Sequence, residues 1–260
     1  MRIALGIEYK GSGFCGWQSQ ASGCGVQDCV ERALAMFLGE PTAVVCAGRT
    51  DTGVHALAQI VHLDTDILRD EVSWVRGTNA NLPAGVRIIW AKCVSDTFHA
   101  RFAARSRSYR YLLLNTPVDN ALMKGMAGWF HAPLDAESMH EAAMTLIGEH
   151  DFSAFRAAEC QAKTPVKTLY EARVSRRCEH LLFTFRGNAF LHHMVRNIVG
   201  SLVYLGAGRQ SLPEFRDIFA SLDRKRAPPT FAADGLYLSG IEYDDAFALP
   251  AFPARFPLVD

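Results

Sequence analysis

The residue with the clearest chemical potential is Asp51, which stands in a polar segment, residues 48–55, between two apolar runs. A strand–loop–strand arrangement would place its carboxylate at a sheet edge on a rigid support, where functional groups are often found. A carboxylate there can act as a nucleophile, or it can cap its own turn, which is common for Asp beside Thr and Gly. The segment alone leaves both interpretations open.

The triplet Asp51-Thr52-Gly53 also occurs in aspartic proteases. Such an enzyme needs two carboxyl groups that share one proton, and therefore either a second triplet or a symmetric dimer of short all-β chains. Here the triplet occurs once, after Arg49-Thr50, in a chain with several predicted helices. A protease is therefore one of the open interpretations, and it predicts peptide cleavage that substitution of Asp51 blocks.

Histidine and cysteine offer little support for metal chemistry. His55, His99, His192 and His193 lie in polar motifs, but they lack the Cys/His or carboxylate spacing of a metal site. The seven cysteines are irregularly spaced and include no C-x-x-C pair, so we expect reduced thiols. We expect neither a metal nor a cofactor.

Hydrophobic periodicity predicts the elements that would position Asp51. Alternation over residues 3–9 predicts a half-buried first strand, and the glycine-bearing loop that follows, residues 11–25, matches no phosphate-binding fingerprint. The other expected elements are a helix over 26–38 that Gly39 ends, strands over 42–47 and 59–63, a helix over 69–79 and a strand over 86–94.

The second half of the chain predicts strands over 109–114, 169–176, 181–186 and 235–243, and helices over 135–147, 190–205 and 213–222. The order forms no regular βαβ units, which favours an α+β fold with largely antiparallel or mixed sheets and helices packed on them. The basic segment 98–111 is interpreted as the link between two domains, residues 1–103 and 104–260, with a cleft between them. On the 190–205 helix, Arg196 and Gly200 share a face apart from the apolar stripe.

Composition excludes several classes of protein. The 260 residues are 49% hydrophobic and 21% charged, which is typical of a folded globular chain and not of a disordered one. Basic and acidic residues balance at 27 each, but residues 101–200 carry 13 basic and 9 acidic side chains, as a phosphate-binding groove would require. No apolar run is long enough for a membrane span, and Glu8 and Lys10 interrupt the N-terminal run, so we expect a cytoplasmic protein.

Four motifs in order resemble those of the TruA family of tRNA pseudouridine synthases. They are Gly48–Ala56, Phe98–Phe102 with Arg107–Tyr111, Gly148–Arg156 and Phe190–Asn197, and Gly235–Leu238 is similar to the closing strand of the family. The resemblance implies the pseudouridine synthase fold, isomerisation of uridine to pseudouridine in the anticodon stem-loop of tRNA, and a homodimer. One departure is the segment 227–234, which is longer than the usual approach to Gly235.

The reaction breaks the N1–C1′ bond, turns the uracil and forms a C5–C1′ bond, for which one ionised carboxylate suffices. The resemblance assigns that carboxylate to Asp51 and the cation that keeps it ionised in a dry pocket to Arg196. It assigns to Tyr109 stacking on the flipped uracil and removal of the C5 proton, directly or through water. Arg49 would enter the space that the flipped base leaves.

Backbone contacts to a stem-loop read shape, so they require basic side chains along a track. The candidates are Arg101, Arg105, Arg107, Arg110, Lys163 and Lys167. A non-catalytic RNA-binding protein on the same scaffold is the remaining alternative, and it predicts that Asp51→Asn leaves both RNA binding and biological effect intact.

Overall fold

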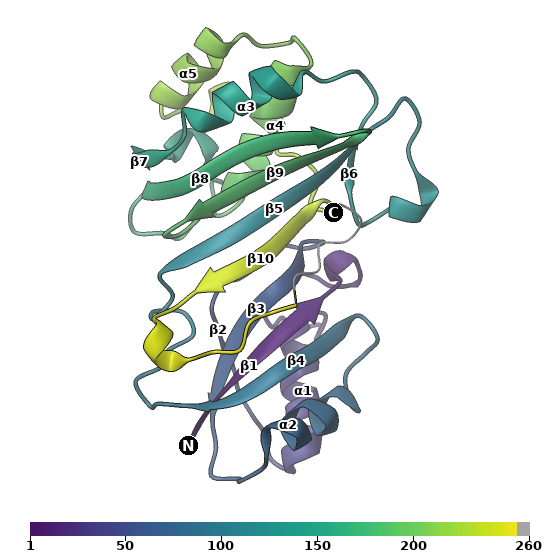
Figure 1. Cartoon of the computed structure of the whole chain (residues 1–260), viewed down its shortest axis with the longest axis vertical. Coiled ribbons are helices and arrows are strands. Elements are labelled where there is room, and N and C mark those ends of the chain that lie inside the picture. The colour runs from purple at the N-terminus through teal and green to yellow at the C-terminus, as the bar shows by residue number, and fades with distance from the viewer. Residues whose placement is uncertain (254–260) are drawn as a thin grey trace. The chain divides into compact units, whose positions relative to one another are not determined.

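A computed structural model of the chain describes residues 1–253, which form two compact units (Figure 1). The first unit contains Met1–Arg105 together with residues 237–253, and the second contains Ser106–Leu236. The sequence-based boundary lay after residue 103 and assigned the C-terminal stretch to the second domain. That stretch returns to the first unit because β10 (Leu236–Glu242) pairs in parallel with β3 (His55–Asp64).

The sheet of the first unit has the strand order β4 (Val86–Val94), β1 (Arg2–Tyr9), β3 and β10. β1 is antiparallel to both of its neighbours, and the short β2 (Val45–Cys46) pairs antiparallel with β3. Helices α1 (Val26–Leu38) and α2 (Glu71–Asn79) pack against each other through the rings of Phe37 and Trp74, whose centroids are 5.5 Å apart. They lie on the same side of the sheet in Figure 1.

The expectation of a half-buried β1 is wrong, because both faces of the strand are covered. Ala4 is fully buried, and the ring of Trp90 lies so close over Gly6 that a Cβ there would be 2.2 Å from it. Tyr243 and Phe247, which follow β10, pack on the cluster that contains Ala4 and Trp90. The small size of alternate residues in β1 therefore reflects close packing and not exposure to solvent.

Two of the seven cysteines, Cys15 and Cys24, are bonded to each other, so the expectation of seven reduced thiols is wrong. The main-chain N–H of Cys15 also donates to the carbonyl of Cys24 at 3.0 Å. The loop returns on itself and brings the two side chains together. The spacing of these cysteines in the sequence does not predict that they pair.

A thiol titration checks this bond directly. The other five cysteines are free, so the unfolded, unreduced protein should give five reactive thiols and seven after reduction. Seven reactive thiols before any reductant is added would show that the two cysteines are not joined in solution.

His62 in β3 should make the stability of the protein sensitive to acid. Its side chain is 4% exposed, and its Nδ1 accepts the main-chain N–H of Ala100 at 3.1 Å. Burial, followed by the charge of Arg2, lowers the pKa of His62 to about 4, below the unfolded value of about 6.5. The unfolded chain therefore binds a proton first as the pH falls, and stability should be lost between about pH 6.5 and pH 4, by on the order of 2 kcal/mol.

Denaturant unfolding at pH 7 and pH 4.5 measures this loss. His62→Asn keeps an acceptor near the position of Nδ1 but does not titrate, so its stability should fall less over this pH range than that of the wild type. His131→Asn replaces an exposed histidine and serves as the control. Equal losses in the wild type and His62→Asn would contradict the assignment.

The sheet of the second unit has the order β6 (Gly128–Phe130), β5 (Ser106–Asn115), β9 (His180–Gly187), β8 (Val166–Arg177) and β7 (Gly148–Asp151). All its pairings are antiparallel except that of β6 with β5. Helices α3 (Ala136–Met144), α4 (Met194–Gly206) and α5 (Leu212–Ala220) lie together on one side of this sheet in Figure 1. The helices and mainly antiparallel strands of both units confirm the α+β fold.

Helix α4 carries one of the predicted site residues and begins four residues later than expected. His193 adopts a left-handed conformation with φ of 60°, which a right-handed helix cannot include, so the helix begins at Met194. The predicted apolar stripe is confirmed, since Met194, Ile198 and Leu202 are all fully buried. Within residues 1–253, no helix has the length and apolar character needed to cross a membrane.

Candidate functional site

Asp51 lies in a tight turn of the first unit, just before β3. The main-chain N–H of Val54 donates to the carbonyl of Asp51 at 3.1 Å, and Gly53 supplies the left-handed φ of 82° that the turn requires. The main chain of Asp51 thus closes the turn, and its side chain is half-buried. The chemical role of the carboxylate stays a prediction.

The strand side of the turn is fixed by β3. Gln59 is fully buried, and its Nε2 donates to the carbonyl of Gly48 at 2.6 Å, while the N–H of Ala47 donates to the carbonyl of Ile60 at 2.8 Å. Arg49 follows Gly48 in the chain, two residues before Asp51, and is exposed. Its place on a fixed main chain with an exposed guanidinium suits a group that enters an RNA helix.

The glycine-bearing loop that follows β1 braces the turn from the other side. A Cβ on Gly11 would lie 1.9 Å from the carbonyl oxygen of Val54, and the N–H of Gly11 donates to Nδ1 of His55 at 3.0 Å. Gly16, with φ of 89°, also lies close to the turn, since a Cβ there would be 2.8 Å from the carbonyl oxygen of Thr50. Gly11 and Gly16 therefore allow the main chain of the loop to pack on the main chain of the turn.

Tyr109 lies on β5 of the second unit and is 9% exposed. It faces Phe185 of β9 in register, and the ring of Phe190 meets it edge to face with centroids 4.9 Å apart. Tyr111 is buried on the same face, as expected, while Arg110 between them is half-buried on the other. Sequence reasoning missed the contact with Phe190, although Phe190 opens the motif that leads to Arg196.

Arg196 lies in the first turn of α4 and is fixed by the segment 227–234. Its Nε donates to the carbonyl of Phe231 at 2.9 Å, and its own carbonyl accepts the N–H of Phe231 at 3.2 Å. Gly200, one turn later, permits this approach, because a Cβ there would be 2.4 Å from the carbonyl oxygen of Pro229. The segment 227–234 therefore orients the guanidinium of Arg196.

Known proteins resemble this chain over nearly its whole length. The family model described as tRNA pseudouridine synthase matches residues 142–244. A protein of Thiobacillus denitrificans named tRNA pseudouridine synthase A is 57% identical over 99% of both chains. Proteins of the same name from Methylobacillus flagellatus and Burkholderia multivorans are 56% identical over 96% of this chain and over 96% and 93% of their own.

This chain belongs to the tRNA pseudouridine synthase A family. The resemblance found in the motifs is thereby confirmed, as is the expectation of an enzyme of the isomerase class. A solved Cbf5-Nop10-Gar1 complex also matches 77% of this chain and 44% of its own, but at 12% identity and a TM-score of 0.36 it adds no argument.

The residues that the family resemblance assigns to the reaction are divided between the units. Asp51 and Arg49 belong to the first unit, and Tyr109 and Arg196 to the second. Each stands on a rigid support: a braced turn for the first pair, and a strand and a helix end for the second. The pairing of Asp51 with Arg196 stays a prediction.

The six basic candidates for RNA contacts differ in their surroundings. Arg101 and Lys163 are exposed, and Arg105 forms an exposed ion pair with Asp244. Arg107 donates to the carbonyl of Asn188 at 3.0 Å, and Arg110 is half-buried. These five remain candidates for a phosphate track.

Lys167 differs from the other five because its side chain is 8% exposed. Its ammonium group donates to the carbonyls of Thr164 and Val166, each at 2.7 Å, and burial lowers its pKa. We interpret Lys167 as a residue that fixes the segment before β8 and not as a phosphate ligand.

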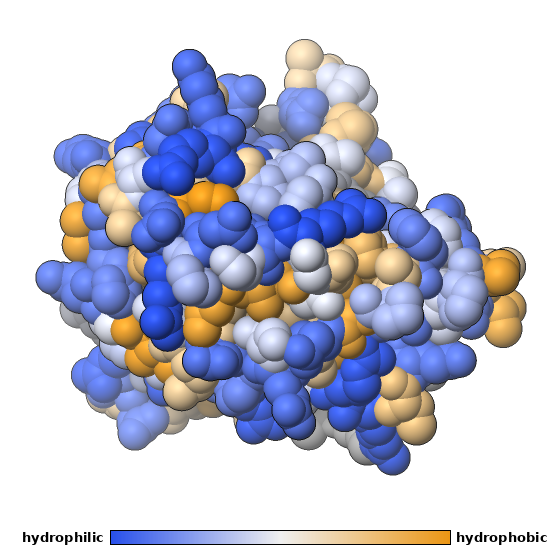
Figure 2. Space-filling view, turned by 90° about the horizontal axis from the view of Figure 1, so that it is seen from above, coloured by the Kyte–Doolittle hydropathy of each residue, from blue (hydrophilic) through white to orange (hydrophobic). Residues whose placement is uncertain are grey.

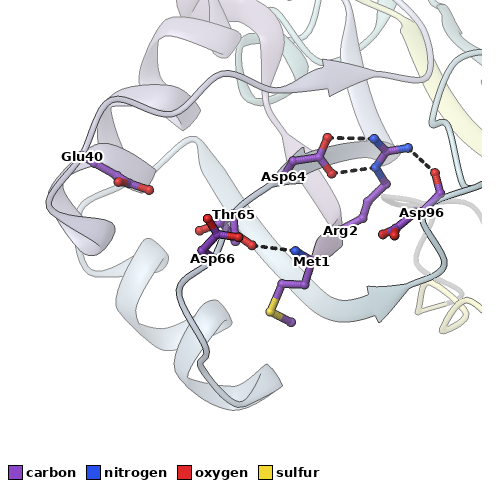
Figure 3. A pocket seen from close by; sticks show the side chains of 7 residues that line it. All are labelled: Met1, Arg2, Glu40, Asp64, Thr65, Asp66 and Asp96. Carbon is purple, nitrogen blue, oxygen red and sulfur yellow. Dashed lines mark hydrogen bonds and ion pairs between the residues drawn. The ribbon is translucent and has the colours of Figure 1, made fainter.

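A depression of about 480 Å³ in the first unit is unsuited to RNA (Figure 3). Arg2 donates to both carboxylate oxygens of Asp64, at 2.8 and 2.7 Å, and to the carbonyl of Asp96 at 2.7 Å. Three further acidic residues, Glu40, Asp66 and Asp96, line the depression, whose only cations among the lining residues are Arg2 and the N-terminal amine. The excess of carboxylates would repel phosphate groups.

The view from above shows apolar patches bordered by hydrophilic side chains (Figure 2). Scattered exposed apolar residues are normal for a soluble protein surface. This face therefore adds no candidate site to those described above.

Proposed function

We propose that this protein converts uridine to pseudouridine in the anticodon stem-loop of tRNA. The observation that carries the proposal is 57% identity, over 99% of the chain, to a protein named tRNA pseudouridine synthase A. The rigid presentation of Asp51 on a turn closed through the main chain supports it, because a reacting carboxylate must be held in place. A non-catalytic RNA-binding protein finds no support, since the relatives bear the name of an enzyme.

In this proposal the carboxylate of Asp51 assists cleavage of the N1–C1′ bond by bonding to the nucleoside or by stabilising positive character at C1′. The uracil then turns and C5 bonds to C1′, and any bond between Asp51 and the nucleoside breaks and returns its electron pair to the carboxylate. The C5 proton leaves and N1 gains a proton, so atoms and electrons balance without a redox partner. Arg196, which Phe231 orients, supplies the positive charge that keeps Asp51 ionised.

Tyr109 stacks on the flipped uracil, and its fixed ring makes that position well defined. The proton of C5 is transferred to Tyr109 directly or through water. Arg49 fills the space that the base leaves, which offsets part of the unstacking cost of a few kcal/mol. Arg101, Arg105, Arg107, Arg110 and Lys163 supply contacts to phosphate groups.

We also propose that the protein works as a homodimer in the cytoplasm, as the family resemblance implies. Sedimentation of the purified protein, alone and with tRNA, measures whether it is a dimer. A monomer at all concentrations would contradict it.

Release of tritium from C5-labelled uridine tests the proposed function. The wild-type protein should release label from tRNA and from an isolated anticodon stem-loop, and the product should contain pseudouridine. A tRNA in which cytidine replaces every uridine of the anticodon stem-loop, and which carries labelled uridine elsewhere, should release none. Failure to release label from any tRNA carrying labelled uridines in this stem-loop would refute the proposal.

A further inference from the structure

A buried hydrogen bond connects the end of β1 to the residue that precedes Asp51. The phenolic oxygen of Tyr9 and Oγ1 of Thr50 are 2.7 Å apart, and either can donate. Tyr9 is 4% exposed and Thr50 is 7% exposed, so water does not compete freely for this bond. A buried hydroxyl pair of this kind restricts the rotamer of the threonine, which is already stiff at χ1.

The main chain of Thr50 is fixed as well. Trp17 donates its main-chain N–H to the carbonyl of Thr50 at 3.0 Å, and its side chain is 1% exposed. The rings of Trp17 and Tyr9 are in contact, with centroids 5.8 Å apart. The side chain of Thr50 is thus held from β1 and its carbonyl from the glycine-bearing loop, and these two supports pack on each other.

Asp51 follows Thr50 directly, and its own carbonyl closes the turn with Val54. The path of the main chain is therefore fixed on both sides of the carboxylate. If Thr50 were free to rotate, the preceding peptide could tilt and move the carboxylate relative to the bound nucleoside. A displacement of about 1 Å at a reacting group can lower a rate by about 100-fold.

Packing alone does not require the hydroxyl of Tyr9. A phenylalanine would fill the same space beside Trp17 and would avoid placing a polar atom in the core. The hydroxyl contributes the bond to Thr50, and that bond reaches the turn that carries Asp51.

We propose that Tyr9 and Thr50 form a positioning pair that fixes the carboxylate of Asp51 for the reaction. This inference rests on the proposed function, in which Asp51 is the reacting carboxylate. Neither residue touches the substrate in this account. Their effect passes through the main chain of the turn.

Kinetics of Tyr9→Phe and Thr50→Val test the pair. Each variant should lower kcat by about 10-fold to 100-fold and leave KM for tRNA within about 2-fold, because RNA contacts are unchanged. The double variant should be no slower than the slower single variant, since each change removes the same bond, that between Tyr9 and Thr50. Thr50→Ser keeps the hydroxyl and should retain kcat within about 3-fold.

Tyr243→Phe is the matched control for stability. The hydroxyl of Tyr243 also donates to a partner inside the first unit, the carbonyl of Ala100 at 2.6 Å, but that bond does not reach the turn. Tyr243→Phe should therefore lower the melting temperature about as much as Tyr9→Phe and leave kcat unchanged. Wild-type kcat in Tyr9→Phe, or an equal loss of kcat in Tyr243→Phe, would overturn the inference.

Asp51→Asn, assayed in parallel, separates this inference from the proposed function. If Asp51→Asn is inactive and Tyr9→Phe retains wild-type kcat, only the positioning pair is refuted. If Asp51→Asn releases tritium at the wild-type rate, the role of Asp51 fails and the pair has nothing to position, whatever the Tyr9 variants do.

Discussion

Asp51→Asn should lower the rate of pseudouridine formation by about 10⁴-fold or more, as removal of a reacting group does in other enzymes. Asparagine has nearly the same shape as aspartate, but it carries no negative charge and is a poor nucleophile. The turn should persist, because the bond between the N–H of Val54 and the carbonyl of residue 51 does not involve the side chain. Affinity for tRNA should therefore stay within a few fold of the wild type.

Tritium release under single-turnover conditions measures the rate, and fluorescence anisotropy with labelled tRNA measures binding. Asp66→Asn, which removes an exposed carboxylate from the same unit, is the control and should be fully active. A non-catalytic RNA-binding protein would show no difference between wild type and Asp51→Asn in either measurement. An aspartic protease would lose peptide cleavage in Asp51→Asn and would be indifferent to RNA.

Elements with strong local signals were predictable from the sequence. The apolar face of α1 and the glycine after it specify both the helix and its end, and Gly39 does adopt the left-handed φ of 80°. The bounds of β4 agree with the prediction, because Val86–Val94 is rich in β-branched and aromatic residues and lies between turn signals. β6 and β7 were not predicted, because strands of three or four residues carry little periodicity. Each depends on its pairing with another strand, β6 with β5 and β7 with β8.

The candidate site divides in the same way. Asp51, Tyr109 and Arg196 were recognisable because their motifs are contiguous in sequence. The contacts that hold these side chains in place were not predictable, because they come from segments that meet only in the folded chain. Phe231 lies 35 residues after Arg196, and its bonds to Arg196 have no local sequence signal.

Gly11→Ala should have the largest effect of any single methyl group added near the turn. The new Cβ would lie 1.9 Å from the carbonyl oxygen of Val54, far inside van der Waals contact, and the obstacle is main chain, which cannot rotate away as a flexible side chain can. The loop and the turn must separate, which also strains the bond from the N–H of Gly11 to His55. We expect a loss of about 3 kcal/mol in the free energy of unfolding, or roughly 6 to 12 °C in Tm.

The same separation displaces the turn that holds Asp51, so kcat should fall by about 100-fold even where the variant is fully folded. Gly13→Ala isolates the cause, because Gly13 belongs to the same short 3-10 turn (Gly11–Gly13) and a Cβ there would meet nothing within 4 Å. Gly13→Ala should keep wild-type stability and activity, which excludes a general effect of lost glycine flexibility. If Gly11→Ala matched Gly13→Ala in both Tm and kcat, the loop and the turn would not be in the close contact on which the positioning of Asp51 depends.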